Sequence, residues 1–478
     1  MRRQLLGASL ISVAAVLCGC SGNQERSPGG DSIALGTVLP FTGRNATIGR
    51  NLEQALQLAV EDVNRAGGVD GHPLRLIVRD SNSGSERGLD ALLELLYLDG
   101  VGYLIGPEET SLAAEIVPDV KALKVFNALP ALTSPSVDRR AVNGAWLRLA
   151  PTPLALGCGL SELSLRAGDS KAVAITTRND FNQSVVSEFS AEFFDEGGVV
   201  TTTVTVPTGQ SSYAERAAFT YRADADRVLL VADPTSAATI VTEAAVARQE
   251  AGWLLGPSLQ TPGFLVNTPP GSLEGAIGVS PTLSLKSECE KRVTGYEGPV
   301  DCVQANAAAF REHFAKRWDG DQPFPAAHFY YDAVLLIAMG LNYAAAKGDD
   351  SPSAAELHAR ILEMTNDAEA RGRWNDLEAS FEQLAQGTPL SFVGAAAEYE
   401  FDRYGAAEHL IFDAWSVSDQ RYVEQGTFQT ECTLESRWAG AVGRDDLDAA
   451  SDNSQSAQGG QDGLGPSEAG AGGQFNDN

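Results

Sequence analysis

The sequence lacks the short motifs that most hydrolases and nucleotide-dependent enzymes need. It contains no G-x-S-x-G elbow, no H-E-x-x-H, no Walker A loop, and no G-x-G-x-x-G after its first expected strand. Cys158 lies between two glycines, and half of a disulfide explains it better than a nucleophile does. We therefore expect a protein that is not an enzyme and that uses no cofactor.

Metal ligands are equally scarce. The chain has only five histidines, and they are scattered along it. Its cysteine spacings lack the paired short pattern of a zinc site. No metal site is expected.

Basic residues are few relative to acidic ones. The 478 residues include 35 Lys and Arg against 63 Asp and Glu, a formal net charge of −28. Such a chain repels phosphate backbones, so a nucleic-acid partner is not expected. Hydrophobic residues make up 43% of the chain, which is typical of a globular protein. A length of 478 residues is too great for one simple core and enough for two lobes of ordinary domain size.

The first 20 residues have the pattern of an export signal. Arg2 and Arg3 precede an apolar stretch from Leu5 to Leu17, which is too short to cross a bilayer as a helix. The stretch ends in Leu-Cys-Gly-Cys, which resembles a bacterial lipobox with Cys20 as the lipidated residue. An ordinary cleaved signal that contains two cysteines is the alternative. Ser21, in place of aspartate, favours the outer membrane in a Gram-negative cell envelope.

Four cysteines remain after the signal, which suggests two disulfides in an oxidising compartment. Cys289 and Cys302 flank a short stretch with Gly and Pro, so a local bridge is the natural pairing. Cys158 and Cys432 would then pair by elimination.

Between a polar tether at residues 21–31 and a polar tail at 444–478, strands alternate with helices. A strand at 32–39 precedes a helix at 49–66 with apolar residues at helical spacing and a Gly-Gly stop. A second such series starts near residue 171. This alternation predicts an α/β fold with doubly wound parallel sheets.

Six stretches, in order, resemble a known family. The sequence is similar to branched-chain amino-acid-type periplasmic binding proteins of the type I class (leucine/isoleucine/valine-binding protein-like), in lipoprotein form. The stretches that carry the resemblance are Ile33–Gly43, Ala59–Gly71, Leu104–Pro107, Pro130–Pro135, His328–Val334 and Glu400–Gly405.

The resemblance implies two parallel-sheet lobes joined by a hinge, with a ligand cleft between them. It divides the chain into a signal peptide (1–20), the tether, two lobes and a disordered tail. The N-terminal lobe would comprise 32–147 plus about 283–347, and the C-terminal lobe 148–282 plus about 348–443.

Ligand contacts in the first lobe are expected in two loops. Thr110 and Ser111 precede a helix, where a hydroxyl can cap the helix, bind a carboxylate, or do both. The resemblance places a ligand-binding threonine at Thr133, beside the backbone carbonyl of Ala131, with Ser134 as a second candidate. An ordinary turn hydroxyl is the alternative for Thr133.

Three further candidates lie in the second lobe. Phe181 matches the place of an aromatic residue that covers the ligand in the family, although core packing explains it equally well. Ser258 stands where amino-acid-binding members often have a glutamate for the ligand's ammonium group. Asp233 could supply that missing charge, or it could cap the next helix.

The resemblance implies a monomeric solute-binding component of an ABC-type importer, with permease subunits as partners. Its ligand would be an amino acid, an amide or a related small solute. The altered site and Ser21 keep open a ligand-sensing or accessory outer-membrane lipoprotein without a transporter.

Overall fold

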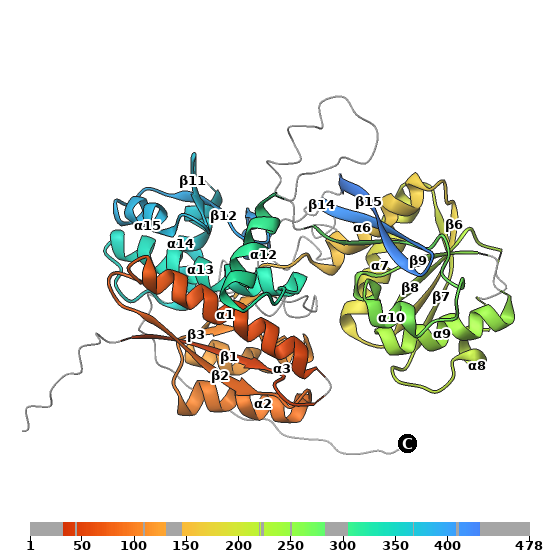
Figure 1. Cartoon of the computed structure of the whole chain (residues 1–478), viewed down its shortest axis with the longest axis horizontal. Helices are drawn as coiled ribbons and strands as arrows, with labels where there is room; N and C mark the ends of the chain where they lie inside the picture. Colours follow the sequence, from red (N-terminus) through yellow and green to blue (C-terminus); the bar gives the residue numbers. More distant parts are fainter. Residues whose placement is uncertain are drawn as a thin grey trace, which may run out of the picture.

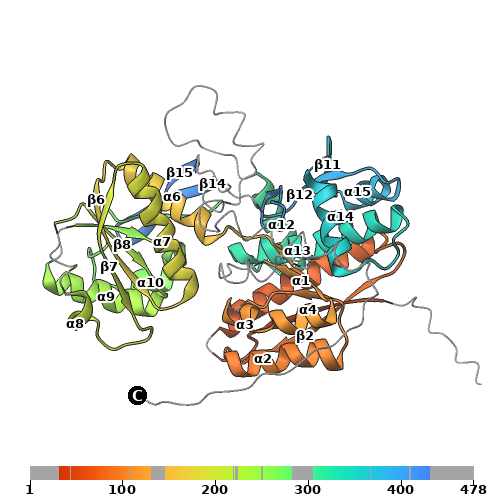
Figure 2. The same ribbon diagram turned by 180° about the vertical axis from the view of Figure 1, so that it is seen from behind.

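The computed structural model describes residues 32–43, 45–108, 110–130, 146–218, 220, 224–248, 251–282, 305–366, 368–407 and 411–430. The signal, the tether, the tail, and the cysteines Cys20, Cys289, Cys302 and Cys432 lie outside these ranges. Figure 1 shows two lobes, and Figure 2 shows the same two bodies from behind.

The first lobe is built on a five-stranded parallel sheet in the order β2-β1-β3-β4-β5. Its strands are β1 (Ile33–Leu39), β2 (Leu74–Asp80), β3 (Tyr103–Ile105), β4 (Phe126–Leu129) and β5 (Trp146–Arg148). The helices between them are α1 (Ala46–Arg65), α2 (Ser85–Leu93) with the π-helical turn η1 (Glu94–Leu98), α3 (Thr110–Glu115) and α4 (Val117–Leu123).

The amphipathic pattern of α1 explains how it packs. Leu52, Leu56 and Val63 form one fully buried face at helical spacing. The helix ends before Gly67 and Gly68, which both have positive φ. A Cβ on Gly68 would overlap the backbone carbonyl of His72, so only glycine fits there.

The second lobe is built on a seven-stranded sheet in the order β15-β14-β10-β9-β8-β6-β7. Its parallel strands are β6 (Lys171–Thr177), β7 (Val199–Val206), β8 (Arg227–Val231), β9 (Gly252–Leu255) and β10 (Ile277–Pro281), and β14 (Ile411–Ser418) and β15 (Arg421–Gln429) add an antiparallel edge. The helices are α6 (Pro153–Arg166), α7 (Asp180–Asp195), α8 (Ala214–Ala217), α9 (Pro234–Ala247), η3 (Pro257–Leu259) and α10 (Pro262–Val266). The predicted α/β architecture of two lobes with parallel-strand sheets is confirmed.

The chain returns to the first lobe and stays there well beyond the predicted boundary at about residue 347. This segment contains α12 (Ala305–Arg317), α13 (Pro325–Ala346), α14 (Ala354–Asn366), β11 (Ala370–Arg373), α15 (Leu377–Ala385), β12 (Leu390–Val393) and β13 (Glu398–Tyr399). Leu357, Phe392 and Tyr399 belong to the first-lobe core. The predicted assignment of residues from about 348 onward to the second lobe is wrong up to residue 407, because their apolar faces are buried against α13.

Helix α13 is the centre of the first lobe. By length and composition it could cross a membrane. However, 89% of its most apolar stretch of 18 residues is buried inside the fold, as in the core helix of a globular lobe. It packs along α1 and also contacts α14 and α15.

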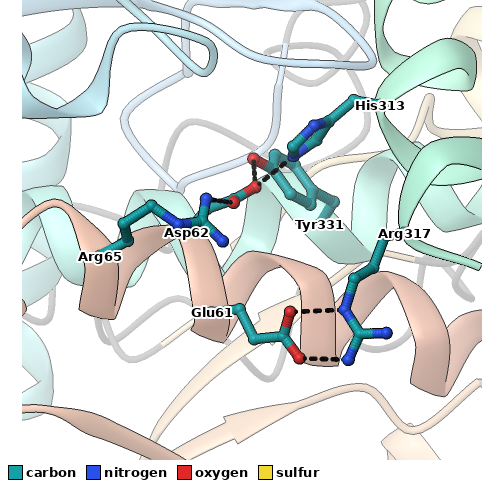
Figure 3. A network of polar contacts seen from close by, with 6 residues as sticks. All are labelled: Glu61, Asp62, Arg65, His313, Arg317 and Tyr331. Atoms are coloured by element: carbon teal, nitrogen blue, oxygen red, sulfur yellow. Dashed lines mark hydrogen bonds and ion pairs between the residues drawn. The ribbon is translucent and has the colours of Figure 1, made fainter.

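Polar contacts join α1 to α12 and α13, as Figure 3 shows. Asp62, which is 8% exposed, accepts hydrogen bonds from His313 Nε2 and from the Tyr331 hydroxyl, both at 2.8 Å, and pairs with Arg65. Burial alone would raise the pKa of Asp62, but the hydrogen bonds from His313 and Tyr331 hold it below its ordinary value. Arg317 forms two further hydrogen bonds to the Glu61 carboxylate.

Candidate functional site

The carboxyl ends of the parallel strands carry the candidate loops in both lobes. In open parallel sheets, loops at this edge present side chains and backbone N–H groups to ligands. In the second lobe, Phe181, Asp233 and Ser258 follow the ends of β6, β8 and β9. These strands are adjacent in the sheet, so the three candidates come from neighbouring loops at one edge.

Asp233 is the most informative of the three. It is the N-cap of α9, where its Oδ1 accepts the backbone N–H of Ser236 at 2.9 Å. Its other oxygen, Oδ2, is buried and has no hydrogen-bond partner in the part of the chain that the structure describes. Capping therefore occupies one oxygen of this carboxylate and leaves the other to accept a donor.

Phe181 is in the first turn of α7. Asn179 caps this helix through its side chain, which accepts the N–H of Asn182 at 2.7 Å. The Phe181 ring is 8% exposed and belongs to the apolar cluster between α7 and the sheet. Core packing accounts for this residue, and its contact with a ligand stays a prediction.

Ser258 lies in the short 3-10 turn η3, directly after β9, and is half-buried. It supplies a hydroxyl and no charge at this edge. Asp233 is therefore the carboxylate among the three second-lobe candidates.

In the first lobe, the loop after β1 is tied to the end of β2. Asp80 accepts the N–H of Phe41 at 2.8 Å and the hydroxyl of Thr42 at 2.6 Å. Burial would raise the pKa of Asp80, but these hydrogen bonds hold it below its ordinary value. The side chain of Ser83 donates to the carbonyl of Thr42 and accepts the N–H of Asn45. The loop after β1 is therefore fixed by the residues that follow β2.

The remaining first-lobe candidates are only partly described. Thr110 and Ser111 begin α3, which places their backbone after β3. Ala131, Thr133 and Ser134 lie outside the described residues, after β4. Their ligand contacts stay predictions.

Cys158 is in α6 and is disulfide-bonded. No other cysteine lies within the described ranges, so the pairing with Cys432 stays a prediction.

Sequence reasoning missed a buried carboxylate that supports this lobe. Asp332 of α13 is fully buried and accepts the N–H groups of Ala395 (2.6 Å) and Ala396 (2.8 Å) and the hydroxyl of Tyr399 (2.9 Å). Burial raises its pKa to about 7 against the lowering effect of these donors. The signal was available in the sequence, because a lone acidic residue in an apolar helix needs buried partners.

Tyr330, next to the Tyr331 of Figure 3, was also missed. It is fully buried, and its hydroxyl has no partner among the described residues. It lies against Gly106, where a Cβ would be 3.5 Å from the Tyr330 oxygen. Nothing in the sequence distinguishes this hydroxyl from an ordinary core tyrosine.

Comparisons with known proteins agree with this architecture. A family model described as "Periplasmic binding protein" matches residues 32–390. The Leu/Ile/Val-binding protein BraC3 of Rhizobium johnstonii is 26% identical over 110 residues, which are 23% of this chain and 30% of that protein. The Leu/Ile/Val-binding protein homolog 7 of Brucella melitensis is 28% identical over 135 residues, 28% of this chain and 32% of that protein. The matched region thus spans about a third of these curated relatives.

Solved structures show the same fold over most of the chain. The leucine-binding protein LivK of Thermotoga maritima superposes with a TM-score of 0.64 at 16% identity, covering 83% of this chain and 99% of that one. The substrate-binding protein LivJ of Streptococcus pneumoniae, in complex with isoleucine, gives 0.62 at 17% identity, covering 83% and 99%. A solute-binding protein of R. palustris in complex with benzoate gives 0.62 at 17%, covering 84% and 98%.

Proposed function

The chain belongs to the periplasmic binding protein family, and from this premise we propose that it is an extracytoplasmic solute-binding protein that closes around a small polar ligand. The resemblance predicted from the sequence is thereby confirmed. The observation that carries the proposal is the second-lobe edge, where Asp233 keeps a buried carboxylate oxygen without a partner in the described chain. Such an oxygen is costly to bury unless a donor reaches it.

The ligand carries a hydrogen-bond donor for Asp233. An ammonium group, an amide N–H or a hydroxyl satisfies this requirement, and an ammonium group would gain most from the negative charge. Ser258 adds a neutral hydroxyl beside it. The first lobe contributes the loops with Thr110, Ser111 and Thr133. The substrate class is therefore an amino acid, an amide or a related small solute.

The proposed location of the protein rests on the lipobox-like stretch that ends at Cys20. Cys20 is the lipidated residue, which anchors a monomer to a membrane of the cell envelope, and permease subunits of an ABC-type importer take the released ligand. Cys20→Ser should move the protein from the membrane fraction to the soluble fraction. A protein that stays membrane-bound after this substitution would contradict the anchor.

A thermal-shift screen of the full chain against amino acids, amides and short carboxylates tests ligand binding. A ligand that binds only the folded form adds ~2.7 kcal/mol of stability at a hundredfold excess over its Kd. We expect a raised melting temperature with at least one class of solute. No shift across the whole panel would overturn the proposal.

Two substitutions of Asp233 separate its two roles. Asparagine is as good an N-cap as aspartate, so Asp233→Asn keeps the cap and removes the charge together with the second acceptor oxygen. Asp233→Ala removes the cap as well and should cost ~1 kcal/mol of stability. We expect both variants to weaken binding of an ammonium-bearing ligand at least tenfold. Unchanged affinity in Asp233→Asn would exclude Asp233 as the ammonium partner.

A ligand sensor or accessory lipoprotein without a transporter is the second candidate. The observation in its favour is Ser258, where amino-acid-binding members of the family often have a glutamate. Copurification of the protein with a permease supports the importer, whereas ligand binding without any permease partner supports the sensor.

A further inference from the structure

The buried hydroxyl of Tyr330 lies near the ligand-binding edge of the first lobe. Helix α1 starts directly after β1, at the carboxyl edge of the sheet. Asn51, in the second turn of α1, accepts the N–H of Phe324 at 2.8 Å and donates to the carbonyl of Gln322 at 2.9 Å. These residues precede α13, so α13 also starts near this edge. Tyr330 is in the second turn of α13.

The hydroxyl lies beside the turn that follows β3. A Cβ on Gly106 would lie 3.5 Å from the Tyr330 oxygen and 3.9 Å from Oγ1 of Thr37. Thr37 already donates to the carbonyl of Ile105 at 2.8 Å, but Tyr330 has no partner in the described chain. Phenylalanine would fill the same space without burying an unpaired hydroxyl. The hydroxyl therefore costs stability in this conformation.

The same turn carries Glu108, whose backbone nitrogen lies 3.3 Å from the position of a Cβ on Gly106. After burial, the second cause that raises the pKa of Tyr330 is the charge of Glu108, two residues beyond Gly106. The phenol is therefore protonated, and toward a carboxylate its hydroxyl is the donor. A carboxylate has about four acceptor positions, so Glu108 can accept this hydroxyl in addition to any other contact it makes.

We propose that Tyr330 is a positioning residue for the ligand site, whose hydroxyl bonds the Glu108 carboxylate when the turn of residues 106–108 rearranges around the ligand. The inference rests on the proposed function, because it deepens the account of the same site. A hydrogen bond to a carboxylate is about twice as strong as a neutral one. The bond that is missing in this conformation is then gained on binding, and it contributes to ligand affinity.

The test uses the full chain and the solute with the highest affinity in the screen described above. Tyr330→Phe should weaken binding about tenfold, while the melting temperature of the protein without ligand stays the same or rises. A purely structural tyrosine would give the reverse, a lower melting temperature with unchanged affinity. That reverse result would overturn the inference.

Tyr331→Phe is the matched control on the same helix. Its hydroxyl already has a partner, because it donates to Asp62 of α1 at 2.8 Å. This variant should melt at a lower temperature and bind the ligand as the unaltered protein does. An equal loss of affinity in both variants would assign the effect to α13 in general and overturn the role of Tyr330.

A double-mutant cycle with Glu108→Gln tests the partner. Each single variant should lose about tenfold in affinity, and the double variant no more than either one, a coupling of about 1.4 kcal/mol. Additive losses would overturn the pairing with Glu108. If the unaltered protein binds no solute, the proposed function itself fails. If the unaltered protein binds a solute and Tyr330→Phe binds the same solute equally well, only the role of Tyr330 is refuted.

Discussion

The Asp332 carboxylate is the point in the first lobe where a single substitution should be most costly. It holds the segment between β12 and β13 against α13 through three donors. The packing leaves no room for adjustment, because a Cβ on Gly394 would overlap the Asp332 carboxyl group. Asp332→Asn keeps the shape and replaces one acceptor oxygen with an NH2 group.

The expected loss follows from the contacts. If the amide nitrogen replaces Oδ2, it faces the N–H of Ala396. If it replaces Oδ1, it faces the N–H of Ala395. In both orientations at least one buried backbone N–H loses its acceptor, which costs ~1–3 kcal/mol, and the remaining bonds lose their charge assistance. We expect a total loss of ~2–4 kcal/mol.

Urea denaturation of the full chain at pH 8 measures this loss, because Asp332 is ionised there. Tyr399→Phe is the graded control, since it removes one donor and leaves the two backbone bonds intact, for a loss of ~1 kcal/mol. The unfolding midpoint should fall further for Asp332→Asn than for Tyr399→Phe. A variant Asp332→Asn as stable as the unaltered protein would refute the role of this carboxylate.

Three further predictions concern stability. Burial raises the pKa of Asp332 to about 7, so the stability linked to its proton is complete below about pH 4 and is lost as the pH rises to about 7. The stability difference between the unaltered protein and Asp332→Asn should be larger at pH 5 than at pH 8, by about 3 kcal/mol, and a difference that does not change with pH would contradict the raised pKa. The pKa of Asp62 is lowered instead of raised, so the stability linked to its charge is present at neutral pH and is lost as the pH falls. Asp62→Asn should therefore cost ~2 kcal/mol at pH 7 and less at pH 3, measured by the same denaturation. A Cβ on Gly49 of α1 would overlap the carbonyl of Pro40, whereas one on Gly263 of α10 meets nothing within 4 Å. Gly49→Ala should lower the melting temperature and Gly263→Ala should not, and equal effects would exclude the steric cause.

The periodic segments were the most predictable part of the fold. The α1 helix and its Gly-Gly stop follow from spacing alone, because a face with Leu52, Leu56 and Val63 can be buried in only one way. The sequence did not predict the lobe to which α14 and α15 belong. An apolar helix face indicates that the helix is buried, but it does not indicate which of the two cores the helix packs against. Residues 354–407 could be assigned only from their contacts with α13.

The candidate site was predictable as a set of loops and less so as individual side chains. The sequence left Asp233 as either a helix cap or a ligand-binding residue. The structure shows that one carboxylate oxygen caps α9 and that the other has no partner among the described residues. Phe181 could cover a ligand or pack in the core, and its burial depends on neighbours from other elements. Tyr330 gave no signal, because an unpaired hydroxyl is defined by three-dimensional contacts.

Small-angle X-ray scattering of the full chain, with and without the solute that binds most tightly, tests the central claim most directly. If the two lobes close around a ligand, the radius of gyration falls on saturation, and the change is smaller at equal ligand concentration in the weakened variant Asp233→Asn. A scattering curve that is the same with and without bound solute would contradict an account in which the lobes close around the ligand.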